Sequence, residues 1–206
     1  VEGGLFTRFP VNAVFGLHNM PGVAAGTVMV RAGPVSAAFD TFDVVIRGQG
    51  GHGAMPEEAR DPIAAAAALI AGVNTIVSRN LKPLDAAVVT IGQILAGETY
   101  NVIPGEATLK GSCRSLSEDG RRVIRRRIRE ICEGVGAAYG VDIECDYHER
   151  YPPVVNTARE SALIVGALSA DPDVFTIVED FEPFMGSEDF AFFLQKTPGA
   201  YFVLGA

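Results

Sequence analysis

Two histidines stand where strand-like segments give way to loops, and histidine is the side chain best suited to bind a metal or exchange a proton near neutral pH. His18 follows the apolar stretch "VFGL" and precedes "NMPG", at the end of a predicted strand. His52 lies within "GQGGHGAMP", whose glycines let the backbone approach another surface closely. Taken alone, each could equally be a structural histidine in a turn. The other polar residues and the elements around the two histidines are needed to choose between these roles.

Further polar candidates lie at two other predicted strand ends. Asn101 lies in the turn between two strands and Arg114 ends the second, so we expect both to point from one end of a single sheet. An arginine fork can hold a carboxylate through two hydrogen bonds, although the spacing also allows a surface ion pair. Gly186 and Ser187 precede a predicted helix with two acids in its first turn, which an ordinary helix cap also explains.

The elements that must position these residues follow from hydrophobic periodicity. Segments 41–48, 85–97, 106–115 and 141–147 have the character of strands, and segment 62–79 has the period of a helix. A second helix is predicted after Ser115, with Ile124, Ile128, Ile131 and Val135 on one stripe. Asp61 is a predicted N-cap with Pro62 at the first helical position, and Ser115 with Glu118 resembles a capping box. The arginines of "GRRVIRRRIRE" are expected to form a solvated helix face. The order strand, helix, strand, strand, helix, strand is that of the ferredoxin-like βαββαβ unit, over about residues 39–150.

The flanking segments predict a second α/β domain that this unit interrupts. Residues 1–38 contain two predicted strands, at 12–18 and 26–33. Residues 151–206 begin with "YPPVVN", which we interpret as a return linker, and continue with two helices and two strands, including a helix over "SEDFAFFLQKT". We therefore expect a domain at 39–150 inserted into an outer domain made of 1–38 and 151–206.

Composition narrows the class of protein. The chain has 206 residues, is 48% hydrophobic and carries a formal net charge of −8, so it can bury a sizeable core and is a poor partner for nucleic acid. No apolar run reaches the roughly 18 residues of a membrane span, and the start has no signal-peptide pattern, which favours a cytoplasmic protein. Cys113, Cys132 and Cys145 lack metal-site spacing and are expected to be buried free thiols.

Four motifs in order carry a family resemblance: "VFGLHNMPG", "GGHGAMP", "YNVIPGEATLKG" and "MGSEDFAFFL". Together they resemble the dinuclear-metal amidohydrolases and metallopeptidases, a family that includes hippurate hydrolase, N-acyl-amino-acid amidohydrolases, auxin-conjugate hydrolases and carboxypeptidase G-like enzymes. The resemblance implies that the outer domain is catalytic and that the inserted domain is a lid that also forms a homodimer. It also implies hydrolysis of the amide bond in a small N-acyl-amino acid or peptide conjugate.

The resemblance assigns a role to each candidate residue. His18 resembles a metal-binding histidine, and His52 resembles a lid histidine that stabilises the oxyanion, often in the partner subunit's site. Asn101 and Arg114 resemble lid residues that hold the substrate, Arg114 through its carboxylate, and Gly186 resembles part of a loop that lines the substrate. Two divalent ions are implied, zinc, manganese, cobalt or nickel, and they would activate a bridging water.

One expectation limits what the 206 residues can do alone. The family's other metal ligands, namely an early Cys or Asp with a His, a Glu pair and a final His, match nothing in this sequence. Because a catalytic metal needs about three protein ligands, we expect an incomplete metal site. The sequence therefore leaves two hypotheses open: part of an amidohydrolase, or a catalytically inactive dimerisation or ligand-binding module.

Overall fold

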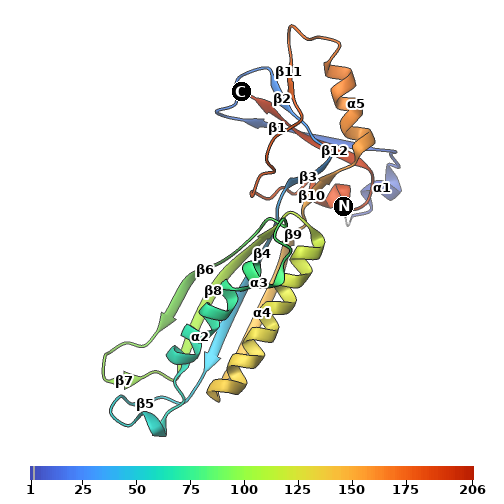
Figure 1. Ribbon diagram of the computed structural model, residues 1–206. Helices are drawn as coiled ribbons and strands as arrows, with labels where there is room; N and C mark the ends of the chain where they lie inside the picture. The colour runs from blue at the N-terminus through green and yellow to red at the C-terminus, as the bar shows by residue number, and fades with distance from the viewer. Residues whose placement is uncertain (2) are drawn as a thin grey trace. The chain divides into compact units, whose positions relative to one another are not determined.

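The computed structural model describes Val1 and residues 3–206, and within these residues the chain forms two compact units. The outer unit joins Val1–Ala38 to Tyr151–Ala206, and the inserted unit is Phe39–Arg150. Figure 1 shows the elements of each unit.

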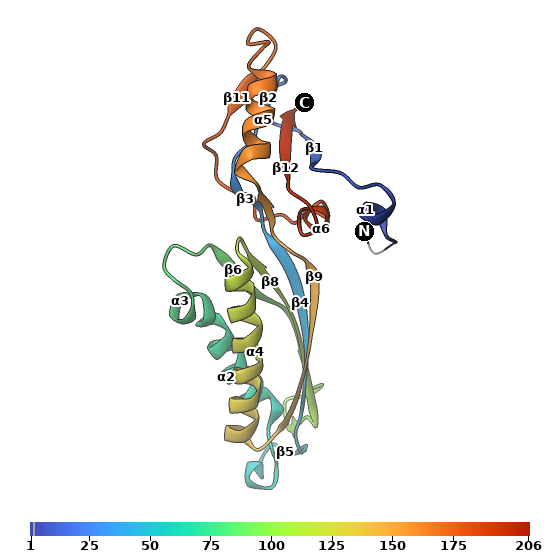
Figure 2. The same ribbon diagram turned by 90° about the vertical axis from the view of Figure 1, so that its right-hand side faces the viewer.

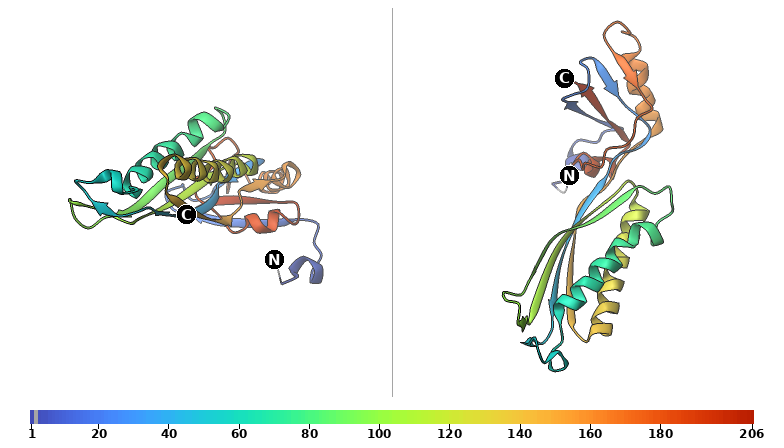
Figure 3. Two further views of the ribbon diagram at one scale, coloured as in Figure 1. Left: turned by 90° about the horizontal axis from the view of Figure 1, so that it is seen from below. Right: turned by 60° about the vertical axis from the view of Figure 1, so that its left-hand side comes forward.

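The inserted unit is a ferredoxin-like sandwich of one sheet and one helical layer. Its elements are β4 (Ala38–Arg47), β5 (Gly51–His52), the 3-10 helix η1 (Pro56–Glu58), α2 (Pro62–Asn74), α3 (Ile76–Asn80), β6 (Ala87–Ala96), β7 (Val102–Ile103), β8 (Glu106–Ser115), α4 (Glu118–Tyr139) and β9 (Asp142–Tyr151). The four long strands lie in the order β6-β8-β4-β9, which confirms the predicted ferredoxin-like fold. Figures 2 and 3 show α2 and α4 on the same face of this sheet.

The core of the inserted unit lies between that sheet and those helices. Along β4, buried and half-buried residues alternate, as expected for a strand with one face toward a core. Phe42, Val44 and Ile46 point inward and pack against Leu69 of α2 and Ile128 of α4. The opposite face of the sheet is covered by no helix of the inserted unit, so side chains such as Phe39 and Asp43 point out from it.

Helix ends in the inserted unit partly follow the predicted caps. The Asp61 carboxylate accepts hydrogen bonds from the backbone N–H groups of Ile63 and Ala64, as predicted for α2. The predicted capping box was wrong: Ser117 is the N-cap of α4 and accepts from the Gly120 N–H at 3.0 Å, whereas the Ser115 hydroxyl donates to the Ser117 carbonyl. The helix predicted over 62–79 is two helices, separated at Thr75.

The outer unit contains a small mixed sheet. Its elements are α1 (Leu5–Arg8), β1 (Val14–Met20), β2 (Thr27–Met29), β3 (Gly33–Ser36), β10 (Val154–Asn156), α5 (Ala158–Leu168), β11 (Thr176–Val178), α6 (Ala191–Leu194) and β12 (Gly199–Gly205). The sheet order is β1-β12-β2-β11, with β1 parallel and β2 antiparallel to β12. The pairing places His18 directly beside Val203 of the central strand β12.

Two predictions for the outer unit were wrong. The segment 151–156 is not a plain linker, because β10 pairs with β3 in a separate two-stranded sheet. The helix predicted from Ser187 begins only at Ala191, so Glu188 and Asp189 lie in the preceding turn and do not occupy a helical first turn. Within the described residues, no helix is both long and apolar enough to cross a membrane.

Candidate functional site

His18 presents one ring nitrogen that is free to act as a ligand or base in the neutral imidazole. Its Nδ1 lies 2.6 Å from the backbone oxygen of Asn19. A carbonyl oxygen can only accept, so Nδ1 carries the proton and Nε2 keeps its lone pair. Metal-binding histidines usually have this arrangement, in which the second nitrogen donates to a carbonyl or carboxylate.

A cavity in the outer unit brings His18 and Gly186 together. Its volume is about 150 Å³, and Ser36, Glu188 and Tyr201 also line it. The Gly186 carbonyl accepts hydrogen bonds from the Ala37 N–H and the Ser36 hydroxyl, which fixes the 184–188 loop beside β3. Two of the predicted site residues, His18 and Gly186, therefore line one cavity, and the prediction did not include its carboxylate, Glu188.

Glu188 is held in the cavity by a tyrosine. Its Oε2 accepts a hydrogen bond from the Tyr201 hydroxyl at 3.0 Å. Burial, and then the charge of the Glu188 carboxylate, raises the pKa of Tyr201 above its ordinary value, so this hydroxyl remains a donor at neutral pH. In the sequence, Glu188 stands two residues after Gly186, and the pattern there also fits an acid that complements a helix dipole.

The ligands that this cavity offers do not complete a catalytic metal site. His18 and Glu188 are one imidazole and one carboxylate, and about three protein ligands are needed. Among the described residues, no group of three or more histidine, cysteine or acidic side chains is placed to hold a metal ion.

His52 has the opposite tautomer and so a different chemical capacity. Its Nδ1 accepts a hydrogen bond from the Ala54 N–H at 3.1 Å, so in the neutral imidazole the proton is on Nε2. The side chain is exposed. His52 is therefore built to donate a hydrogen bond outward, which is what stabilisation of an oxyanion requires.

The glycines around His52 are explained by close backbone packing. Gly51 and His52 form β5, which pairs antiparallel with β7, and the Gly53 N–H donates to the Asn101 carbonyl at 2.8 Å. A Cβ atom at Gly50 would lie 2.9 Å from the Ile103 backbone oxygen, and one at Gly53 would lie 3.1 Å from that of Asn101. The glycines thus allow two loops to meet, and this contact places His52 next to Asn101.

Arg114 lies at the other end of β8 from Asn101, so the expectation that both point from one end of the sheet was wrong. Eight residue steps of β8, at about 3.3 Å each, separate Glu106 from Arg114 by about 26 Å. We call residues 48–61 and 97–105 the distal end of the inserted unit, and residues 39–41, 114–121 and 147–150 its base. Figure 1 shows β5 and β7 at the distal end.

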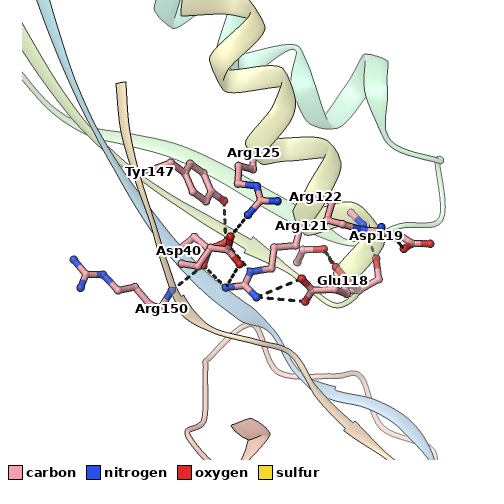
Figure 4. A network of polar contacts seen from close by, with 12 residues as sticks. Asp40, Glu118, Asp119, Arg121, Arg122, Arg125, Tyr147 and Arg150 are labelled. Atoms are coloured by element: carbon pink, nitrogen blue, oxygen red, sulfur yellow. Dashed lines mark hydrogen bonds and ion pairs between the residues drawn. The ribbon is translucent and has the colours of Figure 1, made fainter. Parts of the chain in front are cut away.

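The base is held together by the carboxylate of Asp40, whose side chain is almost completely buried. Figure 4 shows its polar contacts. Its Oδ1 accepts hydrogen bonds from Arg121 Nη2 at 2.7 Å and from the Arg150 backbone N–H at 3.0 Å. Its Oδ2 accepts from Arg121 Nε and the Tyr147 hydroxyl, both at 2.8 Å. Arg121 is itself only 7% exposed, so the prediction of a fully solvated arginine face was wrong at this residue.

The cysteines are free thiols, as predicted; Cys113 and Cys132 are buried, whereas Cys145, which was also predicted to be buried, is only half-buried. The pKa of Cys113 is raised to about 12, chiefly by burial; a hydrogen bond with Tyr147 acts to lower it, and the nearby Asp40 charge acts to raise it. A hydrogen bond from Cys132 lowers the pKa of the half-buried Cys145, and the same contact raises the pKa of Cys132. Cys145 is therefore the thiol most easily converted to a reactive thiolate.

Comparison with known proteins agrees with this fold. Residues 38–140, half of the chain, match the family described as the M20 peptidase dimerisation domain. A Bacillus subtilis structure described as a dinuclear metal binding peptidase of the M20 family covers 99% of this chain, with a TM-score of 0.80 and 31% identity, and the chain covers 50% of it. The chain belongs to the M20 peptidase family.

Curated relatives in this family are amide hydrolases. An N-acetylcysteine deacetylase of Bacillus subtilis is 37% identical over 95% of this chain and 50% of its own length. A hippurate hydrolase of Campylobacter jejuni is 36% identical over 98% of this chain and 52% of its own length. The chain thus spans about half the length of the curated relatives it matches.

Proposed function

We propose that this chain is the lid and part of the catalytic unit of an amidohydrolase that releases an amino acid from an N-acyl-amino acid or a small peptide conjugate. The observation that carries the proposal is the opposite tautomers of two strand-borne histidines. His18 offers a lone pair in a cavity, and His52 offers a proton at an exposed loop. Related chains named as a deacetylase and a hippurate hydrolase support the same class of reaction.

Each residue has a proposed task in amide hydrolysis. The Nε2–H of His52 donates to the carbonyl oxygen as negative charge develops on it, where a hydrogen bond has its largest effect on rate. Asn101, joined to the His52 loop by a backbone hydrogen bond, contacts the substrate beside it. Arg114 binds the carboxylate of the amino acid and fixes its orientation. Gly186 lines the cavity that contains His18.

A divalent metal is part of the proposal through His18 only. When bound, such an ion would lower the pKa of a water molecule and make it a nucleophile. His18 Nε2 is the proposed ligand of this chain. Zinc, manganese, cobalt and nickel are all compatible with an imidazole ligand, and the described residues do not select among them.

The length of β8 requires the active site to be shared between two chains if these tasks are correct. An N-acyl-amino acid is about two residues long, on the order of 7 Å, and cannot span the roughly 26 Å between the two ends of β8. We therefore propose a homodimer in which one site uses Arg114 from one chain and His52 with Asn101 from the other.

The edge strand β6 is the proposed dimer contact within the inserted unit. The two edges of the sheet are β6 and β9. Exposed β6 residues include Val88, Ile94 and Leu95, whereas exposed β9 residues include Asp142, Glu144 and Asp146. An apolar edge favours pairing with another chain, and a charged edge opposes it.

Oligomeric state tests the proposed contact directly. In the 206-residue chain, Ile94→Lys should shift a dimer to monomers in analytical ultracentrifugation. Leu84→Lys is the matched control, because Leu84 is fully exposed in the loop before β6. A monomeric parent chain, or a dimer that resists Ile94→Lys, would refute the β6 contact.

Subunit mixing tests the shared site. In the protein that contains this chain, His52→Ala and Arg114→Ala are each expected to be nearly inactive on N-acetyl- and N-benzoyl-amino acids supplied with zinc or manganese. After random mixing, half of the dimers are hybrids with one intact site, so activity should return to about one quarter of wild type. If native mass spectrometry shows hybrids and activity stays low, the two residues act within one chain. If wild type releases no amino acid from any of these substrates, the amidohydrolase proposal fails.

A further inference from the structure

The guanidinium of Arg114 lies over an aromatic ring that has no part in the proposed tasks. The guanidinium carbon of Arg114 lies 4.6 Å from the centre of the Phe39 ring. Contacts of this kind fall well within the roughly 6 Å over which a guanidinium is attracted to the negative face of a ring. Both residues belong to the inserted unit, so the contact is defined within one compact body.

The alternation of side chains along two neighbouring strands explains why these two side chains meet. In β4, Phe39 alternates with the inward-pointing Asp40, so its ring points away from the helices. In β8, Arg114 lies between the buried residues Cys113 and Ser115 and points to the same open face. Because β8 and β4 are neighbours in the sheet, the arginine extends over the ring of the adjacent strand.

A second neighbour borders Arg114 on the other side. Val88 of β6 is paired directly with Arg114, so its side chain stands on the same face. Phe39 and Val88 thus flank the arginine on two strands. The arginine side chain, which has about 2 kcal/mol of rotamer entropy when it is free, is therefore restricted to the space between Phe39 and Val88.

The backbone at Phe39 is fixed by its neighbour in the base. Asp40, the next residue, is held by hydrogen bonds from Arg121, Tyr147 and the Arg150 backbone (Figure 4). These contacts fix the first residues of β4 against α4 and β9. The backbone of Phe39 is therefore anchored at a point where the chain leaves the outer unit, and it gives the arginine a rigid support.

We infer that Phe39 is a positioning residue that holds the Arg114 guanidinium flat, so that its planar edge faces the carboxylate of the substrate. Stacking engages the face of a guanidinium, whereas a carboxylate is bound by the N–H groups in its plane, so the two contacts are compatible. This inference rests on the proposed function of Arg114. It goes further in assigning part of the carboxylate affinity to an aromatic side chain that never touches the substrate.

A first measurement tests the stacking without any enzyme assay. The Nε–H proton resonance of Arg114 in the 206-residue chain, assigned by its loss in Arg114→Lys, should carry the ring-current shift of Phe39. Phe39→Leu should remove that shift, and Phe39→Tyr should keep it. Phe9→Leu is the matched control, since Phe9 is an exposed phenylalanine of the outer unit. If the chemical shift of the Arg114 Nε–H proton does not change in Phe39→Leu, the inference is overturned.

A second measurement tests the role at the substrate, in the protein that contains this chain. Phe39→Leu should raise KM for N-acyl-amino acids about threefold to tenfold, the range expected for losing a cation–π contact, with kcat nearly unchanged. Phe39→Tyr should restore KM, and the corresponding neutral amides should show no difference between variants. An equal loss on acids and amides, or a fall in kcat that Phe39→Tyr does not rescue, would mean that Phe39 is only structural. Absence of turnover in wild type would instead refute the proposed function, while the resonance still reports whether the stacking exists.

Discussion

The two ends of the inserted unit place functional side chains by different physical means. At the distal end, backbone hydrogen bonds and closely packed glycines hold β5 against β7, and His52 remains exposed. At the base, side chains hold the elements together: the buried carboxylate of Asp40 joins β4, α4 and β9, and the ring of Phe39 lies against Arg114. The difference teaches that substitution of an exposed side chain at the distal end, such as His52, should alter function more than folding, whereas substitutions of side chains at the base should alter both.

The buried ion pair provides the strongest way to test this contrast. Asp40→Ala leaves Arg121 as an uncompensated buried charge and removes the acceptor for Tyr147 and the Arg150 N–H. The free energy of unfolding, measured by urea denaturation of the 206-residue chain, should fall by about 3–5 kcal/mol. Asp119→Asn is the control, because the Asp119–Arg122 ion pair has an 84% exposed carboxylate and should contribute less than about 1 kcal/mol. Equal effects of the two variants would show that burial is not what makes the base strong.

The catalytic contrast between the ends should appear in different kinetic constants. His52→Ala removes one oxyanion donor and should lower kcat by about 100-fold or more in the protein that contains this chain. Arg114→Lys cannot make the paired contact of an arginine and should chiefly raise KM, by an amount equivalent to about 2 kcal/mol.

Substrate charge provides the control for that pair. The Arg114→Lys effect should shrink when the carboxylate of the substrate is replaced by a neutral amide, and the His52→Ala effect should not. If His52→Ala mainly raises KM, His52 is not the oxyanion donor. If Arg114→Lys has the same effect on acids and on neutral amides, Arg114 does not bind the carboxylate.

Two glycine substitutions test whether backbone packing organises the distal end. Gly50→Ala places a Cβ atom 2.9 Å from the Ile103 oxygen and should destabilise the unit by about 1–3 kcal/mol. The amide proton of Gly53, which donates to Asn101, should then exchange faster. Gly92→Ala is the matched control, because a Cβ there meets nothing within 4 Å and should change stability by less than about 0.5 kcal/mol. If exchange at Gly53 is unchanged in Gly50→Ala, the close approach does not hold the loop.

The reactivity of the cysteine thiols is the property expected to change least, and it depends on the structure of the base through Cys113. Because the pKa of Cys113 is raised from 9.0 to about 12 in the folded chain, its thiol should stay protonated at pH 8.5 and react with iodoacetamide only after unfolding. Cys145 should react first, since its pKa is lowered. The raised value also means that Cys113 favours folding below about pH 9 and that this contribution is lost as pH rises toward 12. Asp40→Ala should increase alkylation of Cys113, and mass spectrometry that finds Cys113 modified first in wild type would contradict the ranking.

Local chemistry written into the sequence determined the elements and most of the residue types in the candidate site. Alternation along residues 41–48 predicted β4, the order of helices and strands predicted the ferredoxin-like fold, and Asp61 was recognised as a cap. These features depend on neighbours within a few residues, so a linear pattern is sufficient to read them. The position of His52 at the end of β5 is a local property of the same kind, whereas His18, which we predicted at a strand end, lies within β1, because that strand continues to Met20.

Tertiary structure alone decided which residues meet. The pairing of Phe39 with Arg114 depends on β8 lying beside β4, and the burial of Arg121 depends on Asp40, which is 81 residues earlier in the chain. Sequence spacing had placed Asn101 and Arg114 together because both flank one strand, but an extended strand separates its two ends by about 3.3 Å for every residue. The neighbours that fix a tautomer, bury a charge or support an arginine come from across the sheet, and no one-dimensional pattern contains that information.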